Sequence, residues 1–558
     1  MMNRITMKRE PLRQQLASMM ARLSSMMLAL LFTSSLFAQK DLKPEEIEVV
    51  SIYQPVLSDA VKIDFPATIP SRESSGKLEL IYSTPEKLLP VEFEPADLKP
   101  LAIAKEKPVK YPMSYFKLGF GTQLSPLIEA LWNDGKYEKY NYGFFARHFS
   151  SHGLKLDDHV FSENHFSVFG NYFTKKARIN SELFYHREGV RYYGYDHDSI
   201  SLDLKDLKQH FNNISWTAGI ANIKSKNAFE YDIRFGYGYF AGKNKIKESN
   251  PRFVITASKV FKKKHHVSVK LVEDYSRFKK TASVNRNIFT FKPMYEFNDQ
   301  VWKIYGGIDL TWENSIFHVF PELGMERSLY DEYIVMYSGW RMELKRTSYQ
   351  SLTDENPWLG ENFELRNSWF EDRYGGFKGT VKDFSYNLRM AQKLVRRLPF
   401  FINDSTDLKK FAVVYDPRTI ILNFHAELFY HLTQDWNISA TLEYNHFEVD
   451  DIEKPWHQPS FIFDFNTQYS IKKKVYLTLD ILARDRVTAK IPRSLTDDLT
   501  GKIELKGTLD LNIGAIYKFN HHFSFFCNLN NLASIKYQKY YLYPSYGFNG
   551  MIGATFTY

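Results

Sequence analysis

The sequence predicts an all-β protein that crosses a membrane as an antiparallel β-barrel. Three observations lead to this prediction: long stretches alternate apolar and polar residues, aromatic residues end these stretches beside short turns, and the chain closes on an aromatic strand. Aromatic residues make up 16% of the 558 residues, whereas the mean hydropathy is only −0.39. After residue 40 no run of apolar residues approaches the ~18 that a membrane helix needs. We therefore expect strands to cross the membrane.

The first 38 residues have the pattern of a signal peptide. Lys8, Arg9, Arg13 and Arg22 precede an apolar run over residues 26–32, and the small residue Ala38 follows at a cleavage position. A retained anchor would need about 20 apolar residues, and this run is shorter. We expect export and cleavage after Ala38.

Residues 39–112 are expected to form an extended, proline-rich periplasmic segment. Ten of the 22 prolines lie between Asp41 and Pro112. Proline lacks a backbone N–H and fixes φ, so at this density neither a regular helix nor a long strand is expected. We expect the segment to be an extended tether that becomes ordered when it binds a partner.

From residue 113 to the end, side chains alternate between two chemically different faces. Between residues 461 and 469, Phe461, Phe463 and Phe465 share one face, while Asp464 and Asn466 share the other. Because successive side chains of a strand point to opposite sides, one face suits lipid and the other water. Coarse counting gives about 22 strands, with 18 or 20 also admissible.

The water-facing positions carry charges of both signs. They are Glu230, Asp232, Arg234, Lys270, Glu443, Asp464, Asp480 and Asp510. These side chains either line a path that biases which solutes pass, or only solvate a wide interior and pair across strands. The sequence leaves both interpretations open.

Turn placement favours a membrane barrel over a soluble sandwich or propeller, whose strands also alternate. Short polar turns lie between aromatic residues, as between Tyr430 and Trp436. They alternate with longer polar loops over residues 188–210, 345–374 and 485–500. This asymmetry is typical of barrels with short periplasmic turns, long external loops and aromatic girdles.

The last strand places aromatic and apolar residues on one face. Phe548, Ile552, Phe556 and Tyr558 share that face, and the chain ends on Tyr558. A terminal strand of this form resembles the signal read by the outer-membrane assembly machinery. That machinery and outer-membrane lipid are therefore expected partners.

The chain resembles the barrel of TonB-dependent receptors. The resemblance is carried by Cys527-Asn528-Leu529-Asn530-Asn531-Leu532 and by Tyr543-Pro544-Ser545-Tyr546-Gly547-Phe548. Residues 114–121 and 398–404 are similar to receptor-like barrels common in the Bacteroidetes group. The resemblance covers residues 113–558 and implies an outer-membrane location and solute transport.

Typical receptors carry a large folded plug ahead of the barrel, and residues 39–112 are too few and too rich in proline for one. One short stretch nevertheless resembles a TonB box: Glu46, Ile47, Glu48, Val49, Val50 and Ser51. It is either a contact site for TonB or another periplasmic protein, or one apolar patch of the tether.

The sequence indicates no enzyme, no cofactor, no metal site and no nucleic-acid partner. Lys and Arg are dispersed, so no basic stripe suits nucleic acid. His148, Ser151 and His152 lack an identifiable acid partner, and the adjacent histidines at 265–266 and 521–522 sit in short turns. The single Cys527 reads as a small hydrophobic residue.

The expected function is passive or partner-gated transport of solutes through a plug-less barrel. One alternative is a non-conducting scaffold, its lumen blocked by loops, that anchors a partner through residues 41–112. The other is uptake energised by TonB at residues 46–51.

Overall fold

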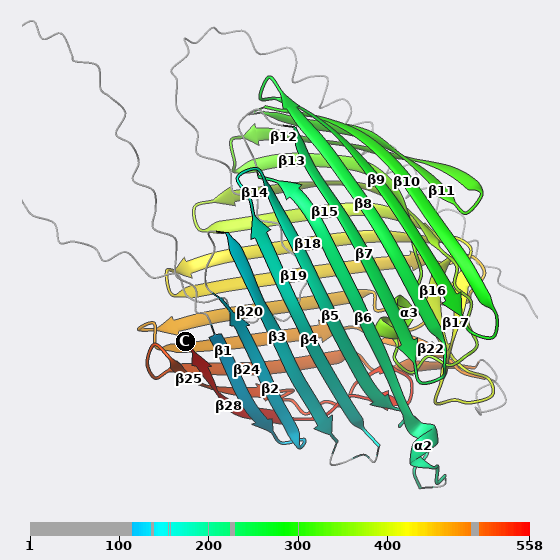
Figure 1. The fold of residues 1–558 in the computed structure, drawn as a ribbon. Coiled ribbons are helices and arrows are strands. Elements are labelled where there is room, and N and C mark those ends of the chain that lie inside the picture. Colours follow the sequence, from blue (N-terminus) through cyan, green and yellow to red (C-terminus); the bar gives the residue numbers. More distant parts are fainter. Residues whose placement is uncertain are drawn as a thin grey trace, which may run out of the picture. The chain divides into compact units, whose positions relative to one another are not determined.

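The computed structural model describes residues 114–558 except 135–138, 154–155, 157, 199, 224–228, 300 and 493–500. One antiparallel sheet dominates it (Figure 1). Its strands are β1 Ser114–Gly121, β2 Ser125–Asn133, β3 Tyr140–His152, β4 Val160–Phe173, β5 Ala177–Arg191, β6 Lys208–Asn222, β7 Glu230–Gly242, β8 Lys247–Phe261, β9 His265–Lys279, β10 Ser283–Asn298, β11 Trp302–Glu313, β12 Ile316–Tyr330, β13 Ile334–Lys345, β14 Ser368–Val381, β15 Phe384–Arg396, β18 Thr419–Thr433, β19 Trp436–Glu448, β20 Phe461–Ile471, β21 Val475–Arg484, β24 Thr508–Lys518, β25 Phe523–Asn530 and β28 Asn549–Thr557.

The sheet closes on itself. Each of its 22 strands pairs with the strands before and after it, and β28 pairs with β1 from Tyr115–Thr557 to Gly121–Met551. Ser114 and Tyr558 also exchange backbone hydrogen bonds of 2.8 and 2.9 Å. Closure leaves no unpaired edge, which is what a sheet in lipid requires. The predicted antiparallel barrel of about 22 strands is confirmed.

Large apolar side chains cover the outside of the ring. On β28, Ile552 is 66% exposed, and its partner Phe120 on β1 is 57% exposed. Similar residues recur at every second position of other strands, among them Phe166 and Val168 on β4 and Leu509 and Ile513 on β24. A soluble sandwich would bury such residues, whereas a membrane barrel presents them to lipid. Among the described residues, no helix is long and apolar enough to span a bilayer.

Aromatic pairs ring the end that holds the C-terminus. The ring centroids of Tyr140 and Tyr172 lie 5.1 Å apart, and those of Trp436 and Tyr469 lie 5.6 Å apart. Each pair joins neighbouring strands where these meet short turns. Aromatic rings with a polar edge suit the membrane–water interface, so these pairs form the expected girdle.

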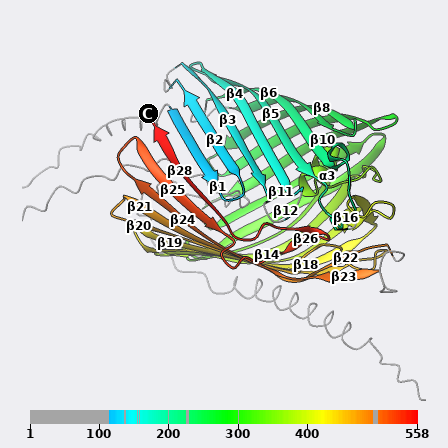
Figure 2. The same ribbon diagram turned by 90° about the horizontal axis from the view of Figure 1, so that it is seen from below.

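The two ends of the barrel differ in their connections. At the C-terminal end no connection exceeds seven residues. At the other end lie long connections over residues 192–207, 346–367, 397–418, 449–460, 485–507 and 531–548. They hold α2 Leu204–Leu207, α3 Tyr349–Glu355, β16 Leu398–Asn403, β17 Phe411–Asp416, β22 Val487–Lys490, β23 Lys502–Leu505, β26 Gln538–Tyr540 and β27 Tyr543–Pro544. Figures 1 and 2 show α3, β16 and β22 together at the end away from the C-terminus. In outer-membrane barrels the short turns face the periplasm, so the long loops face outward.

The predicted signal peptide, the proline-rich segment and the TonB-box-like stretch at residues 46–51 lie outside the described residues. They stay predictions.

Closure at the β28–β1 seam depends on a glycine. A Cβ atom at Gly553 would lie 2.1 Å from the carbonyl oxygen of Leu118, whereas one at Gly236 on β7 would meet nothing closer than 3.9 Å. We expect Gly553→Ala to destabilise the barrel by about 1–3 kcal/mol through overpacking. Urea unfolding of the refolded protein in liposomes measures this change.

Gly236→Ala is the matched control and is expected to unfold like the wild type. Equal stability of the two variants would contradict the account of the seam.

Candidate functional site: the lumen and its loop cap

The lumen wall holds the charges that the sequence placed on the water-facing side. All eight lie on the strand face opposite the exposed apolar residues; on β24, for example, Asp510 lies between the exposed positions 509 and 513. Several have partners: Arg234 binds Asp232, Asp480 accepts a hydrogen bond from Asn466, and Glu443 accepts one from Asn423 at 3.2 Å. Within this set, Asp232 and Arg234 contact each other. Selection of solutes by the eight charges stays a prediction.

The long loops share one hydrophobic core, which we call the loop cap. Its buried side chains come from loops and from the upper inner wall of the barrel. They are Tyr193, Phe211, Phe240, Ile246, Phe278, Tyr349, Leu352, Leu359, Phe363, Phe401, Phe411, Tyr540 and Tyr543. Residues from the two ends of this set are more than 300 positions apart in the chain, so the core ties distant loops together.

The β13–β14 loop reaches across to the wall formed by β8, β9 and β10. Arg346 lies 3.5 Å from both Glu248 on β8 and Asp274 on β9. The backbone N–H of Tyr349 donates to Glu248 Oε2 at 2.8 Å, and Arg286 on β10 donates to the carbonyl of Thr347 at 2.6 Å. Ser348 caps α3 through a reciprocal capping box with Ser351. Helix α3 is thereby fixed inside the mouth of the barrel.

Tyr543 connects three further loops to the β13–β14 loop. Its ring stacks on Trp358 at 3.9 Å and meets Tyr193 edge-on at 4.8 Å, and its hydroxyl donates to the carbonyl of Lys409. Tyr193 in turn donates to the carbonyl of Pro544 at 3.2 Å. One side chain, that of Tyr543, therefore contacts residues of four loops: β5–β6, β13–β14, β15–β18 and its own β25–β28 loop.

Two polar residues tie the β19–β20 loop to neighbouring loops. The buried Asp416 accepts hydrogen bonds from the backbone of the β19–β20 loop, including the N–H of Asp451 at 2.9 Å, and from the Thr419 hydroxyl at 2.7 Å. His457 contacts the carbonyl of Phe401 through Nδ1 at 3.0 Å, while its Nε2 accepts from the N–H of Tyr541 at 3.4 Å. Nε2 can accept only when the ring is neutral. Burial, assisted by nearby Lys539, lowers the pKa of His457 to about 4 and keeps it neutral.

Loops from widely separated strands thus meet over the lumen at the outward-facing mouth. A loop-blocked lumen entered the sequence analysis only as a feature of the scaffold alternative. The residues of the cap were not predicted, because period-two alternation identifies strands but gives no information on how loops fold. The five tyrosines of the 531–548 loop are a signal that could have indicated a packed structure.

The histidine and serine residues weighed for catalysis do not meet as the sequence grouped them. His148 contacts Asn164 at 2.8 Å and Ser150 at 3.3 Å, whereas Ser151 contacts the Tyr546 hydroxyl at 2.8 Å. His265 at its turn contacts the Tyr295 hydroxyl at 2.7 Å. Half-buried Cys527 is a free thiol.

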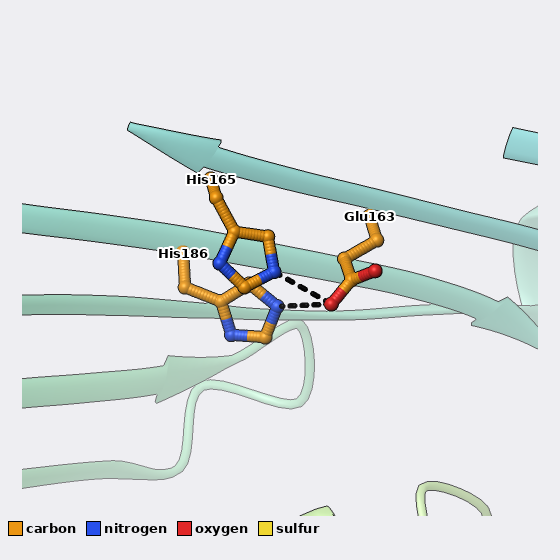
Figure 3. Close-up of side chains that lie close together, drawn as sticks. All are labelled: Glu163, His165 and His186. Atoms are coloured by element: carbon orange, nitrogen blue, oxygen red, sulfur yellow. Dashed lines mark hydrogen bonds and ion pairs between the residues drawn. The ribbon is translucent and has the colours of Figure 1, made fainter. Parts of the chain in front are cut away.

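A different trio comes together on the lumen wall, and the sequence analysis did not single it out. Glu163 and His165 on β4 and His186 on β5 point toward one another (Figure 3). Their ligating atoms all lie within 4.8 Å of one another. The signal was a Glu-x-His pair on one strand, but the strand pairing that adds His186 is a tertiary feature.

Comparisons with solved structures identify the same barrel. The siderophore receptor PirA from Acinetobacter baumannii is 10% identical, with 80% of this chain and 81% of that chain covered and a TM-score of 0.63. The FrpB iron transporter from Neisseria meningitidis, F3-3 variant, is 9% identical with the same coverage and a TM-score of 0.65. The ferric-catecholate import receptor Fiu from Escherichia coli K12 is 9% identical over 81% of this chain and 82% of that chain, with a TM-score of 0.61.

No protein-family model matches the chain, and no curated protein sequence does. At these identities the solved structures establish the fold, a barrel like that of TonB-dependent receptors. Together with the outward apolar belt, this fold places the protein in the outer membrane.

Loss of the Tyr543 ring should loosen the cap and leave the barrel closed. We expect Tyr543→Ala to lower the free energy of local opening by about 3–5 kcal/mol, the usual cost of removing a buried aromatic side chain. Amide hydrogen exchange should then accelerate over residues 346–367 and 531–548. Phe519→Ala, which removes a 62% exposed ring at a periplasmic turn, is the control and should change neither loop. Unaltered exchange in Tyr543→Ala would show that the loops are not held together at this residue.

The cap should also loosen in acid. An opened cap returns His457 to its ordinary pKa of 6.5, so the opened state binds more protons than the closed state between pH 6.5 and about 4. The contribution of His457 to the stability of the cap is complete above pH 6.5 and falls by roughly 3 kcal/mol as the pH drops through this window. Hydrogen exchange corrected for intrinsic rates measures the slope. His159, whose pKa burial also lowers to about 4, adds to this loss, so the double variant His159→Gln, His457→Gln should be less destabilised between pH 6.5 and 4 than the wild type.

Proposed function

We propose that the protein is a partner-gated transport barrel of the outer membrane, whose lumen is kept closed by its own outer loops. The observation that carries this proposal is the loop cap. A polar, ion-paired wall suits passage of hydrated solutes, and the cap lies across its outward mouth.

Unassisted opening is expected to be rare. Exposing fully buried side chains such as those of Tyr543 and Phe411 costs roughly 2–3 kcal/mol each, and they would have to separate together. Buried groups that lose partners, such as Asp416 and Glu248, would add to the cost. A ligand or protein that binds the opened loops could supply this free energy, and the proline-rich segment at residues 39–112 is a candidate contact from the periplasmic side.

The similar solved proteins are named as a siderophore receptor and an iron transporter, and from them we carry over only outer-membrane transport. TonB as the periplasmic partner is a second form of the same proposal. Deletion of residues 46–51 would abolish uptake if TonB engages this stretch, and normal uptake after the deletion would exclude it.

The cap also favours one alternative of a different class, a scaffold whose lumen never opens. In that case residues 41–112 would anchor a partner, and deletion of this segment would abolish its co-purification. The barrel would conduct nothing in any form.

Single-channel conductance in planar bilayers separates these functions. We expect the mature protein to be mostly silent and Tyr543→Ala to show frequent large openings, because the cap is the barrier. A protein lacking residues 41–112 tests whether that segment is a second barrier. Phe519→Ala should behave like the wild type. Silence from every variant, with the barrel shown to be folded by heat-modifiable migration, would refute transport and favour the scaffold.

A further inference from the structure

We propose that Glu163, His165 and His186 form a binding site for a divalent transition-metal ion on the lumen wall. This inference is independent of the transport proposal and rests on the geometry of the three side chains (Figure 3).

The strand pairing of β4 and β5 assembles the donors. His165 and His186 are directly opposite each other in the register, and Glu163 lies two residues along β4 on the same face. The two imidazole rings are 4.2 Å apart between centroids. A rigid sheet thus presents two nitrogens and one oxygen without a rearrangement of the backbone.

The donor atoms have nearly the spacing that a metal ion would impose. His165 Nε2 lies 2.6 Å and His186 Nε2 lies 3.6 Å from the same oxygen, Glu163 Oε1. Ligands at about 2.05 Å around a tetrahedral Zn²⁺ are about 3.3 Å apart, so small side-chain rotations suffice. The longer distance exceeds a hydrogen bond, and His186 Nε2 is buried with no hydrogen-bond partner among the described residues. A metal ion would use this nitrogen.

Neighbouring charges support a cation at this place. Arg147 donates to the other carboxylate oxygen, Glu163 Oε2, at 3.1 Å and leaves Oε1 directed at the histidines. Such an outer contact orients a metal ligand. Further carboxyl groups lie nearby: Glu129 lies 3.6 Å from Arg147, and Glu188 faces Glu163 in the register. Asp354 on α3 lies close enough to His186 for an electrostatic interaction.

Solutes in the lumen can reach the site. The three side chains are 21–22% exposed, which leaves room for water or a solute at further coordination positions. Two imidazoles and one carboxylate suit Zn²⁺, Cu²⁺, Ni²⁺ or Fe²⁺ better than Mg²⁺ or Ca²⁺, which prefer oxygen ligands. Asp354 places the site next to the loop cap.

Zn²⁺ titration of the purified full-length mature protein, with any affinity tag removed, tests the proposal by calorimetry and by metal content after equilibrium dialysis. We expect one saturable ion per chain, and at least tenfold weaker binding in His165→Gln and in His186→Gln. The matched control is His425→Gln on β18: His425 Nε2 lies 2.9 Å from Glu427 Oε1, the same His–Glu arrangement without a second histidine. This control should bind like the wild type.

Cu²⁺ paramagnetic resonance gives a second readout, since nitrogen hyperfine coupling should change from two nitrogens to one in either histidine variant. Circular dichroism and heat-modifiable migration confirm that each variant is folded. Absence of saturable Zn²⁺ binding in the wild type, or unchanged binding in both histidine variants, would overturn the site. Conductance is not part of this test, so its outcome is separate from that of the transport proposal.

Discussion

Closure of the hydrogen-bonded ring is the constraint on which the rest of the structure depends. Lipid offers no partner to a backbone N–H or C=O group, so the first strand must pair with the last. The β1–β28 seam meets this requirement, and Gly553 allows the backbones to approach. A closed ring of 22 strands is wide, and its outward faces are committed to lipid. Its interior must then be hydrated, filled or covered.

In this protein the lumen wall is polar, and the outer loops cover the outward-facing opening of the barrel. Ion pairs such as Arg389–Asp372 at 2.5 Å satisfy charges along the strands, and the outer loops form a core of their own above them. The cap is held by the same interactions that stabilise a small soluble domain: stacked aromatic rings, a capped helix and buried hydrogen-bonded acids. Glu248 and Arg286 of the wall bond directly to the β13–β14 loop, so opening of the cap would break contacts of the upper lumen wall.

The strands could be predicted from the sequence, and the cap could not. Alternation in segments such as residues 461–469 depends only on the period of a strand and on the contrast between lipid and water, so the two faces and the girdle followed directly. The strand number followed only approximately, as about 22 with 18 or 20 also admissible, because strand boundaries are the least certain part of the pattern. The contact of Tyr543 with Trp358, and of His186 with Glu163, depends on which strands and loops become neighbours after closure. Inward charges could be placed by alternation, but the contact of Asp232 with Arg234 and the hydrogen bond of Asn466 to Asp480 were not predicted, because alternation does not say which side chains meet.

The most direct test of the account is labelling of the lumen from outside the cell. A cysteine at Glu182, an exposed position of β5 on the face shared by His186, in a Cys527→Ser background would report access of a membrane-impermeant maleimide to intact cells. A closed cap predicts slow labelling in the otherwise wild-type chain and fast labelling once Tyr543 is replaced by alanine. Rapid labelling of the chain with its cap intact would show that the mouth is open and contradict the account.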